Sequence, residues 1–427
     1  MKKTWLSLGL LWVSLHAQTY TLDELVTSAF KNSPDINISS IDVALSKERY
    51  DKAFSGYLPK LDLQAAALHK NTLDAPLGLN GEDTVLSGSL SFSQLLYDFG
   101  KTSSLVLHAK KSTQSSNAAL TESMLQKRLE VQTKYYGILR YKELIVVNKE
   151  NIKLNESQLH RAKRYYETGI RTKVDISDAE VRLIKAQIAL KNAEFNLQKA
   201  FAALDRAVGF THIGMHYDVE VKKFDSSYKV YETLPPYPYE LEKAIEYAYT
   251  HRPKLKKFAY AKEAAKALVK NAKAAYFPAL SLNGEYTKSD AKKYNFIYDQ
   301  EKWEAGLTLK WNLYGGGRDR AKIAENRLQT DKRNAQLTRA MLEIKEETTN
   351  AYIALQKSKE DVKLSQNLLK FAKLKFEQVS KQYEHGLSDY IELQEARQSY
   401  IDAKSALVVN YYNYYAAIAA LDAAIGR

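Results

Sequence analysis

The chain has 427 residues, of which 45% are hydrophobic, and a formal net charge of +13; this composition excludes a largely disordered protein. It has no cysteine, which excludes a disulfide framework, a thiolate metal site, a cysteine nucleophile and a lipid-bearing cysteine. Only 17 glycines and 8 prolines interrupt it, and residues 77–234 and 279–427 contain no proline. Because helix breakers are so few, we expect long helices.

The N-terminal residues predict an exported protein. Lys2 and Lys3 precede an apolar run that ends near Ala17, a pattern typical of a secretory signal peptide over residues 1–17. The run is too short to cross a bilayer as a helix, and no later apolar segment reaches the length that a spanning helix needs. The basic charge does not indicate a nucleic-acid partner, because Lys and Arg alternate with Asp and Glu along the predicted helices.

The rest of the chain is a tandem repeat. The first copy covers residues 18–209, the second covers 241–427, and an irregular connector over 210–240 joins them. Each copy is expected to form a helix, two strands, a long helix, a turn and a last helix. The paired motifs are Tyr57-Leu58-Pro59 with Tyr276-Phe277-Pro278, Tyr97 and Gly100-Lys101 with Tyr314 and Gly317-Arg318, and Tyr166-Glu167-Thr168-Gly169 with Tyr383-Glu384-His385-Gly386.

Four segments alternate apolar and polar residues with the period of a β-strand. They cover about 59–70 and 84–97 in the first copy, and about 278–289 and 301–314 in the second. Each has about the length of a tilted membrane-spanning strand. A soluble half-buried sheet alternates in the same way, but no further layer of sequence remains to cover four apolar strand faces. We therefore expect the apolar faces to meet lipid.

Aromatic residues gather at one end of the predicted strands. In up-and-down hairpins the starts of odd strands and the ends of even strands lie on one side, where an interfacial aromatic girdle forms. Trp303 is assigned to the opposite membrane interface. The residues assigned to the near interface are Tyr57, Tyr97, Tyr276, Phe277, Trp311 and Tyr314.

Long helices follow the strands. They are expected over about 101–166 and about 318–384, and the helices after the turns over about 172–208 and about 389–425. At 1.5 Å per residue each long helix would measure roughly 100 Å. Spacing that alternates between three and four residues favours helix hairpins packed side by side, although any extended coiled-coil scaffold would show it too. One such row is Leu369, Ala372, Phe376, Val379 and Tyr383.

Four strands in one chain imply an oligomer. They cannot close a barrel, and open strand edges are not tolerated in lipid. Two copies would supply eight strands and three copies would supply twelve. An eight-stranded barrel is filled by side chains, whereas a larger barrel leaves a lumen. The polar strand faces favour a water-filled lumen and therefore a trimer.

The doubled motifs resemble those of the TolC-type outer membrane efflux protein (outer membrane factor) family over residues 20–427. The resemblance implies a mainly α fold with a β-barrel part, in which a homotrimer forms a 12-stranded outer-membrane barrel continued by a periplasmic α-helical coiled-coil barrel. It implies a passive exit duct of a tripartite efflux pump or type I secretion system of a Gram-negative bacterium, with no cofactor. The implied partners are outer-membrane lipid, a periplasmic membrane-fusion adaptor and an inner-membrane RND or ABC transporter.

Acidic pairs follow both helix turns. Glu392 and Glu395 are three residues apart and share a helix face, and Asp175 with Asp178 repeats the spacing in the first copy. Acids at a helix N-terminus also stabilise the helix dipole. The resemblance implies a second role, in which Glu392 and Glu395 form a cation-attracting ring at the periplasmic aperture and Asp175 and Asp178 are their equivalents.

The resemblance also assigns the turns themselves. Tyr383 and Arg171 are the possible gate contacts, although Ser388 stands where the family has an arginine, so the locking contacts are expected to differ. Glycines at helix turns also serve as C-caps. The turn tips expected to meet the adaptor are Gly169, Ile170, Gly386 and Leu387.

No catalytic constellation is recognisable, so we expect no enzyme. Gly315-Gly316-Gly317 lacks the Lys-Ser/Thr pair of a phosphate loop and is interpreted as a strand-to-helix junction. His212 and His216 have metal-like spacing but fall in the connector, and no metal site is predicted. The alternative to an outer-membrane duct is a periplasmic coiled-coil adaptor or scaffold without a barrel, and an exported enzyme is a third class. The exported substrate is not readable from the sequence.

Overall fold

The computed structural model describes residues 18–72, 81–169, 172–211, 217–220, 230–293 and 296–427. The predicted signal peptide lies outside these residues. The chain divides into two compact units. A helical unit contains the described residues up to 37 together with 123–252 and 344–427, and a sheet unit contains 38–122 and 253–343. Each unit therefore takes residues from both halves of the chain.

The two halves of the chain contain helices of equal length in the same order. The first half has α1 (Leu22–Asn32), α2 (Pro34–Phe54), α3 (Lys101–Glu167) and α4 (Lys173–Val208). The second half has α5 (Leu241–His251), α6 (Pro253–Lys273), α7 (Arg318–Glu384) and α8 (Tyr390–Ile425). Helices α3 and α7 both have 67 residues, and α4 and α8 both have 36. Short 3-10 turns are η1 (Ser55–Tyr57), η3 (Val230–Thr233) and η4 (Ala274–Tyr276).

Each half of the chain begins with two helices where the sequence predicted one. The backbones of Ser33 and Arg252 are extended immediately before Pro34 and Pro253. A residue before proline avoids the helical conformation, because the proline ring clashes with its backbone and Cβ. The two prolines thus separate α1 from α2 and α5 from α6.

The core of the helical unit is built from α1, α3, α4 and α8. Its buried members include Leu25 of α1, Ile138 of α3, Leu204 of α4 and Val408 of α8. A short parallel pair of strands, β1 (Gln18–Tyr20) and β4 (Tyr217–Val219), lies in the same unit. The sequence predicted an irregular connector in the region of β4, because a three-residue strand has too little periodicity to be recognised.

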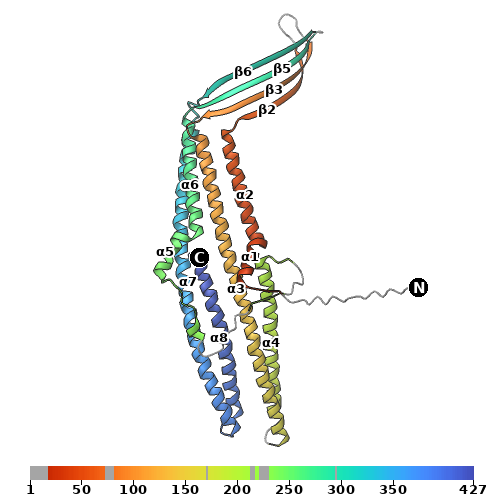
Figure 1. The fold of residues 1–427 in the computed structure, drawn as a ribbon, viewed down its shortest axis with the longest axis vertical. Helices are drawn as coiled ribbons and strands as arrows, with labels where there is room; N and C mark the ends of the chain where they lie inside the picture. Colours follow the sequence, from red (N-terminus) through yellow and green to blue (C-terminus); the bar gives the residue numbers. More distant parts are fainter. Residues whose placement is uncertain (1–17, 73–80, 170–171, 212–216, 221–229, 294–295) are drawn as a thin grey trace, which may run out of the picture. The chain divides into compact units, whose positions relative to one another are not determined.

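The sheet unit contains one antiparallel sheet. Its strands are β2 (Lys60–Thr72), β3 (Gly81–Tyr97), β5 (Ala279–Lys293) and β6 (Phe296–Lys310). They lie side by side in the order β2-β3-β5-β6 (Figure 1). The central β3–β5 pair joins the first half of the chain to the second. A bulge between Leu95 and Tyr97 shifts the register of this pair at the end of β3.

The sheet has one apolar face and one polar face. One row across the four strands consists of Leu63, Leu90, Tyr286 and Trp303. The next row, on the opposite face, consists of Gln64, Ser89, Thr287 and Lys302. The apolar row is uncovered, because Leu63 is 81% exposed and Trp303 is 79% exposed. A soluble sheet would bury such a row against a second layer.

The strands differ from their predicted bounds mainly at their ends. Strand β6 ends at Lys310, before the expected end at 314. The next residue, Trp311, lies outside the strand and donates its indole N–H to the carbonyl oxygen of Tyr276 at 2.9 Å. No helix in the described part of the chain combines the length and apolar character that a membrane-spanning helix needs.

Candidate functional site

A glycine with a left-handed backbone stands at each of the two helix turns of the helical unit. Gly169 ends the α3 hairpin arm and Gly386 ends the α7 arm, and both have φ of +73°. A left-handed residue is the usual way to end a helix, and glycine adopts it without a steric penalty. Leu387 follows Gly386 and is 79% exposed. Ile170 and Arg171, assigned to docking and gating, lie outside the described residues.

The start of α8 holds the second-repeat acids. Asp389 is the N-cap of this helix, and its carboxylate accepts a hydrogen bond of 2.7 Å from the backbone N–H of Glu392. The Ser388 hydroxyl donates to the Glu392 carboxylate at 2.7 Å. Glu392 and Glu395 are exposed. Glu392 thus has a local partner, and Glu395 projects into solvent one turn later.

The start of α4 uses its acids differently. Asp175 accepts hydrogen bonds from the backbone N–H and the hydroxyl of Thr172, at 2.9 and 3.0 Å, so it closes a capping box. It also lines a small hollow with Tyr383 and Tyr390. Asp178 is exposed. From the sequence, Asp175 and Asp178 were expected to be equivalent to Glu392 and Glu395. In the structure Asp175 is half-buried between the hairpins, whereas Glu392 is exposed.

Tyr383 lies where the two hairpins meet. It is buried in a cluster with Val379, Leu393 and Ala396, against which Tyr165 of α3 packs. The Tyr383 and Tyr390 rings have their centroids 6.4 Å apart. Beside this cluster Arg161 of α3 approaches Glu384 of α7, with Nη1 and Oε1 separated by 3.8 Å. Tyr383 is therefore part of the packed junction between α3, α7 and α8.

Three polar groups on one face of α8 are buried beyond this junction. Gln394 is 2% exposed and Arg397 is 4% exposed. In the described structure the Tyr390 hydroxyl, both polar atoms of the Gln394 amide and Nη1 of Arg397 have no hydrogen-bond partner. These residues are four and three positions apart, so they follow one helix face. A buried polar group without a partner costs free energy. The hydrogen-bonding capacity of this face of α8 is therefore incompletely satisfied in the packed structure.

Burial changes the ionisation of this face. Burial, together with a smaller charge repulsion from Arg182 of α4, lowers the pKa of Arg397 to about 10 from its ordinary 12.5. Burial also raises the pKa of the Tyr390 phenol. Sequence reasoning missed these residues. The available signal was a polar stripe with helical spacing on the side of α8 where Leu393 and Ala396 are buried.

A second candidate region is the aromatic end of the sheet unit. Phe99 has a left-handed backbone with φ of +51°, and its ring stacks on Phe277 at 5.1 Å and meets Tyr97 edge-on at 4.7 Å. Phe99 was not among the sequence-predicted interface residues. The side chains of Tyr57, Tyr97, Tyr276, Phe277, Trp311 and Tyr314 are all exposed. Trp303 is the central residue of the 15-residue strand β6.

The sequence matches a known protein family twice. The family model described as "Outer membrane efflux protein" covers residues 25–210 and again 244–427. The chain belongs to the outer membrane efflux protein family. The two matches correspond to the two halves that contain equal helices.

Named relatives of this outer membrane efflux protein agree with the match. The outer membrane efflux protein BepC of Brucella suis is 21% identical over 96% of this chain and 86% of its own length. The outer membrane protein TolC of Vibrio cholerae is 24% identical over 69% of this chain and 65% of its own length. This chain is therefore an outer-membrane protein of a Gram-negative bacterium, as the sequence predicted, and its family is one of transport proteins.

Solved structures show the same fold. The Campylobacter jejuni CmeC outer membrane channel superposes with a TM-score of 0.82 at 18% identity, over 95% of this chain and 85% of its own. A CusC structure has a TM-score of 0.82 at 16% identity, over 97% of this chain and 95% of its own. The mainly helical efflux-channel fold is thus confirmed.

The described residues contain no group of three or more His, Asp or Glu side chains placed to hold a metal ion. His212 and His216, whose spacing resembled that of metal ligands, lie outside the described residues.

Proposed function

We propose that this outer membrane efflux protein forms a homotrimeric exit duct with a 12-stranded barrel in the outer membrane. The observation that carries the proposal is the sheet, which has an uncovered apolar face and a polar opposite face. Within the described residues β2 pairs only with β3, and β6 pairs only with β5, so both edges are available. Open edges in lipid must be paired, which requires neighbouring copies.

The direction of the edge strands fits a closed ring. In an antiparallel sheet of four strands the outer two, β2 and β6, run in opposite directions. Placing β6 of one copy beside β2 of the next continues the antiparallel alternation. Repeating this head-to-tail contact by rotation can form a closed ring. Serine and threonine on the polar face suit a water-filled lumen, which favours twelve strands over a side-chain-filled barrel of eight.

The helix hairpins would continue the duct into the periplasm as a coiled-coil barrel. The duct would be passive, with transport driven by an inner-membrane RND or ABC transporter of a tripartite efflux pump or type I secretion system. A periplasmic membrane-fusion adaptor would open it at the turns. The exposed Leu387 beside Gly386 supports docking at this tip.

Docking at the turn is tested by Leu387→Asp. This change should impair export without changing trimer content, because it places a charge on an exposed apolar tip. Complementation of export in a strain that lacks the native gene is the readout, with adaptor levels measured in parallel. Normal export at normal adaptor levels would exclude docking through this residue.

The acids at the start of α8 would form the constricting ring. Three-fold symmetry would bring three copies of Glu392 and Glu395 together, and such a ring attracts cations and repels anions. Replacing both residues with Gln should weaken cation selectivity and block by trivalent cations in planar bilayers. Replacing the exposed Glu156 and Glu180 with Gln is the matched control, and equal effects of the two pairs would remove the ring assignment.

The duct itself is tested by mass and conductance. The protein extracted from outer membranes in mild detergent should have the mass of three chains and should form ion-conducting channels in planar bilayers. A stable monomer that does not conduct would favour the alternative of a periplasmic coiled-coil adaptor or scaffold.

A further inference from the structure

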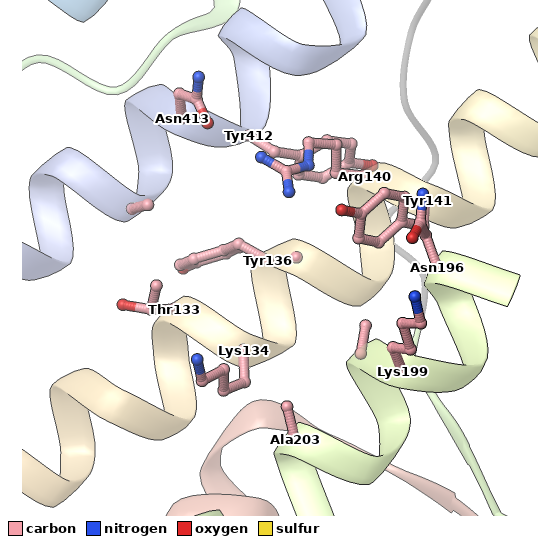
Figure 2. A pocket seen from close by; sticks show the side chains of 13 residues that line it. Thr133, Lys134, Tyr136, Arg140, Tyr141, Asn196, Lys199, Ala203, Tyr412 and Asn413 are labelled. Carbon is pink, nitrogen blue, oxygen red and sulfur yellow. The ribbon is translucent and has the colours of Figure 1, made fainter. Parts of the chain in front are cut away.

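A hollow of about 340 Å³ lies between α3, α4 and α8 in the helical unit. Its volume is that of a small-molecule site. Figure 2 shows side chains from the three helices around it. The lining residues are Thr133, Lys134, Tyr136, Gly137, Arg140 and Tyr141 of α3, Asn196, Lys199, Ala200 and Ala203 of α4, and Tyr412, Asn413 and Ala416 of α8.

The hollow is positively charged. Lys134, Arg140 and Lys199 line it, and no Asp or Glu is among its lining residues. None of the three has a carboxylate partner elsewhere in the described part of the chain, although many other lysines and arginines of this protein do. Three cations around one small volume repel one another, so the hollow has a positive potential that an anion would neutralise.

The same hollow has aromatic and amide walls. The Arg140 guanidinium lies over the Tyr141 ring, 4.9 Å from its centroid, which orients the guanidinium as a planar donor. Burial raises the pKa of the Tyr136 phenol, so this ring stays uncharged at neutral pH. The amides of Asn196 and Asn413 add hydrogen-bonding capacity at the rim.

We propose that this hollow binds organic anions with an aromatic body. The carboxylate or sulfonate of such a solute would take the fork of Arg140 and the ammonium groups of Lys134 and Lys199, because charge-assisted hydrogen bonds are the strong ones. Its ring would lie against the tyrosine walls, where offset or edge-on contacts stabilise aromatic pairs. A simple inorganic anion would lack the second set of contacts.

The position of the hollow gives it a role in transport, and this step rests on the proposed duct. On α3 the buried residues Tyr135, Ile138 and Leu139 pack on the core that includes α1. Gly137 and Arg140 line the hollow and lie on the opposite side of the helix. If the core around α1 lay on the inner side of the helical wall, it would obstruct the duct. We therefore place this core on the outer side of the wall. The hollow then faces the lumen and is a transit site for anionic substrates.

Channel block by an aromatic anion tests the site. The probe is pyranine, a planar aromatic trisulfonate, added to the wild-type protein in planar bilayers. It should block the current at concentrations at which methyl viologen, an aromatic dication, has less effect. The triple variant Lys134→Gln, Arg140→Gln and Lys199→Gln should weaken the pyranine block about tenfold or more, since several charge-assisted contacts are lost.

A matched control separates a site from general charge. Lys149→Gln, Lys153→Gln and Lys163→Gln change the net charge equally at exposed positions of α3, and should leave the block within about twofold of wild type. Equal weakening by both triple variants, or no weakening by the first, would overturn the proposed site.

Binding in solution separates the site from the duct. Fluorescence anisotropy of pyranine with the detergent-solubilised protein should show the same loss of affinity in the first triple variant, and this readout requires no conductance. Binding without any channel activity would contradict the duct and retain the anion site. Conductance without pyranine binding would contradict the anion site and retain the duct.

Discussion

The glycines that end α4 and α8 lie close to backbone atoms of other segments, and this close packing can be tested by substitution. Gly209 caps α4 with φ of +84°, and a Cβ placed there would lie 2.6 Å from the carbonyl oxygen of Asn32. Gly426 caps α8 with φ of +86°, and its Cβ would lie 3.0 Å from Cα of Arg252. Gly386 also has positive φ, +73°, but a Cβ there would meet nothing within 4 Å.

These distances predict a ranking for substitution by alanine. The left-handed conformation alone costs about 1 kcal/mol for a residue with a Cβ, and this is the whole expected effect at Gly386. At Gly209 the clash is with backbone atoms that cannot rotate away, which adds about 1–3 kcal/mol. Gly209→Ala should therefore cost about 2–4 kcal/mol, with Gly426→Ala between the other two.

Thermal unfolding of the purified full-length variants, followed by circular dichroism at one scan rate, measures the ranking. A single scan rate is required because membrane oligomers commonly unfold irreversibly. The midpoint should fall most for Gly209→Ala, less for Gly426→Ala and least for Gly386→Ala. If Gly386→Ala were as damaging as Gly209→Ala, the close approach of α4 to Asn32 would not be what requires glycine there.

Three further predictions concern buried and membrane-facing groups. Arg397→Met should raise the unfolding midpoint, because removing a buried charge without a complete set of partners stabilises by about 1–4 kcal/mol; a large decrease would reveal a partner for this arginine. Leu63→Lys should lower the amount of assembled protein in the outer membrane, because a lysine facing lipid costs about 2–4 kcal/mol, whereas Gln64→Lys on the other face should be tolerated. Burial raises the pKa of Asp422 above its ordinary 3.8. Its contribution to stability is therefore full below the unfolded-state pKa and is lost as pH rises through the folded-state pKa. Asp422→Asn should flatten the dependence of the unfolding midpoint on pH on the alkaline side of the ordinary aspartate pKa, and an unchanged profile would contradict the assignment.

Periodic and long-range regularities were the part of the fold that sequence could predict. The 67-residue helices follow from the lack of proline and the coiled-coil spacing, and their lengths in the structure match within each pair. The strand faces follow from strict alternation, and Leu63 and Trp303 lie in one row of the sheet. Both signals extend over many residues, so local exceptions do not hide them.

Features set by single contacts were not predictable. The break between α1 and α2 depends on one residue before Pro34, and β6 stops where the Trp311 indole binds a carbonyl group. The difference between Asp175 and Glu392 arises because Thr172 and Ser388 hold the two carboxylates differently. Arg397 looked like any helical arginine, because its burial depends on the packing of helices far apart in sequence.

The central claim is that β6 of one copy pairs with β2 of the next in a ring of three. Because the chain has no cysteine, Asp62→Cys near the start of β2 and Lys310→Cys at the end of β6 would place two unique thiols on the opposite edges. Cross-linking intact outer membranes with a short bis-maleimide should give covalent dimers and trimers and nothing larger, and neither single-cysteine variant should give the trimer. A ladder beyond three chains, or efficient cross-linking within one chain alone, would contradict the closed twelve-stranded barrel.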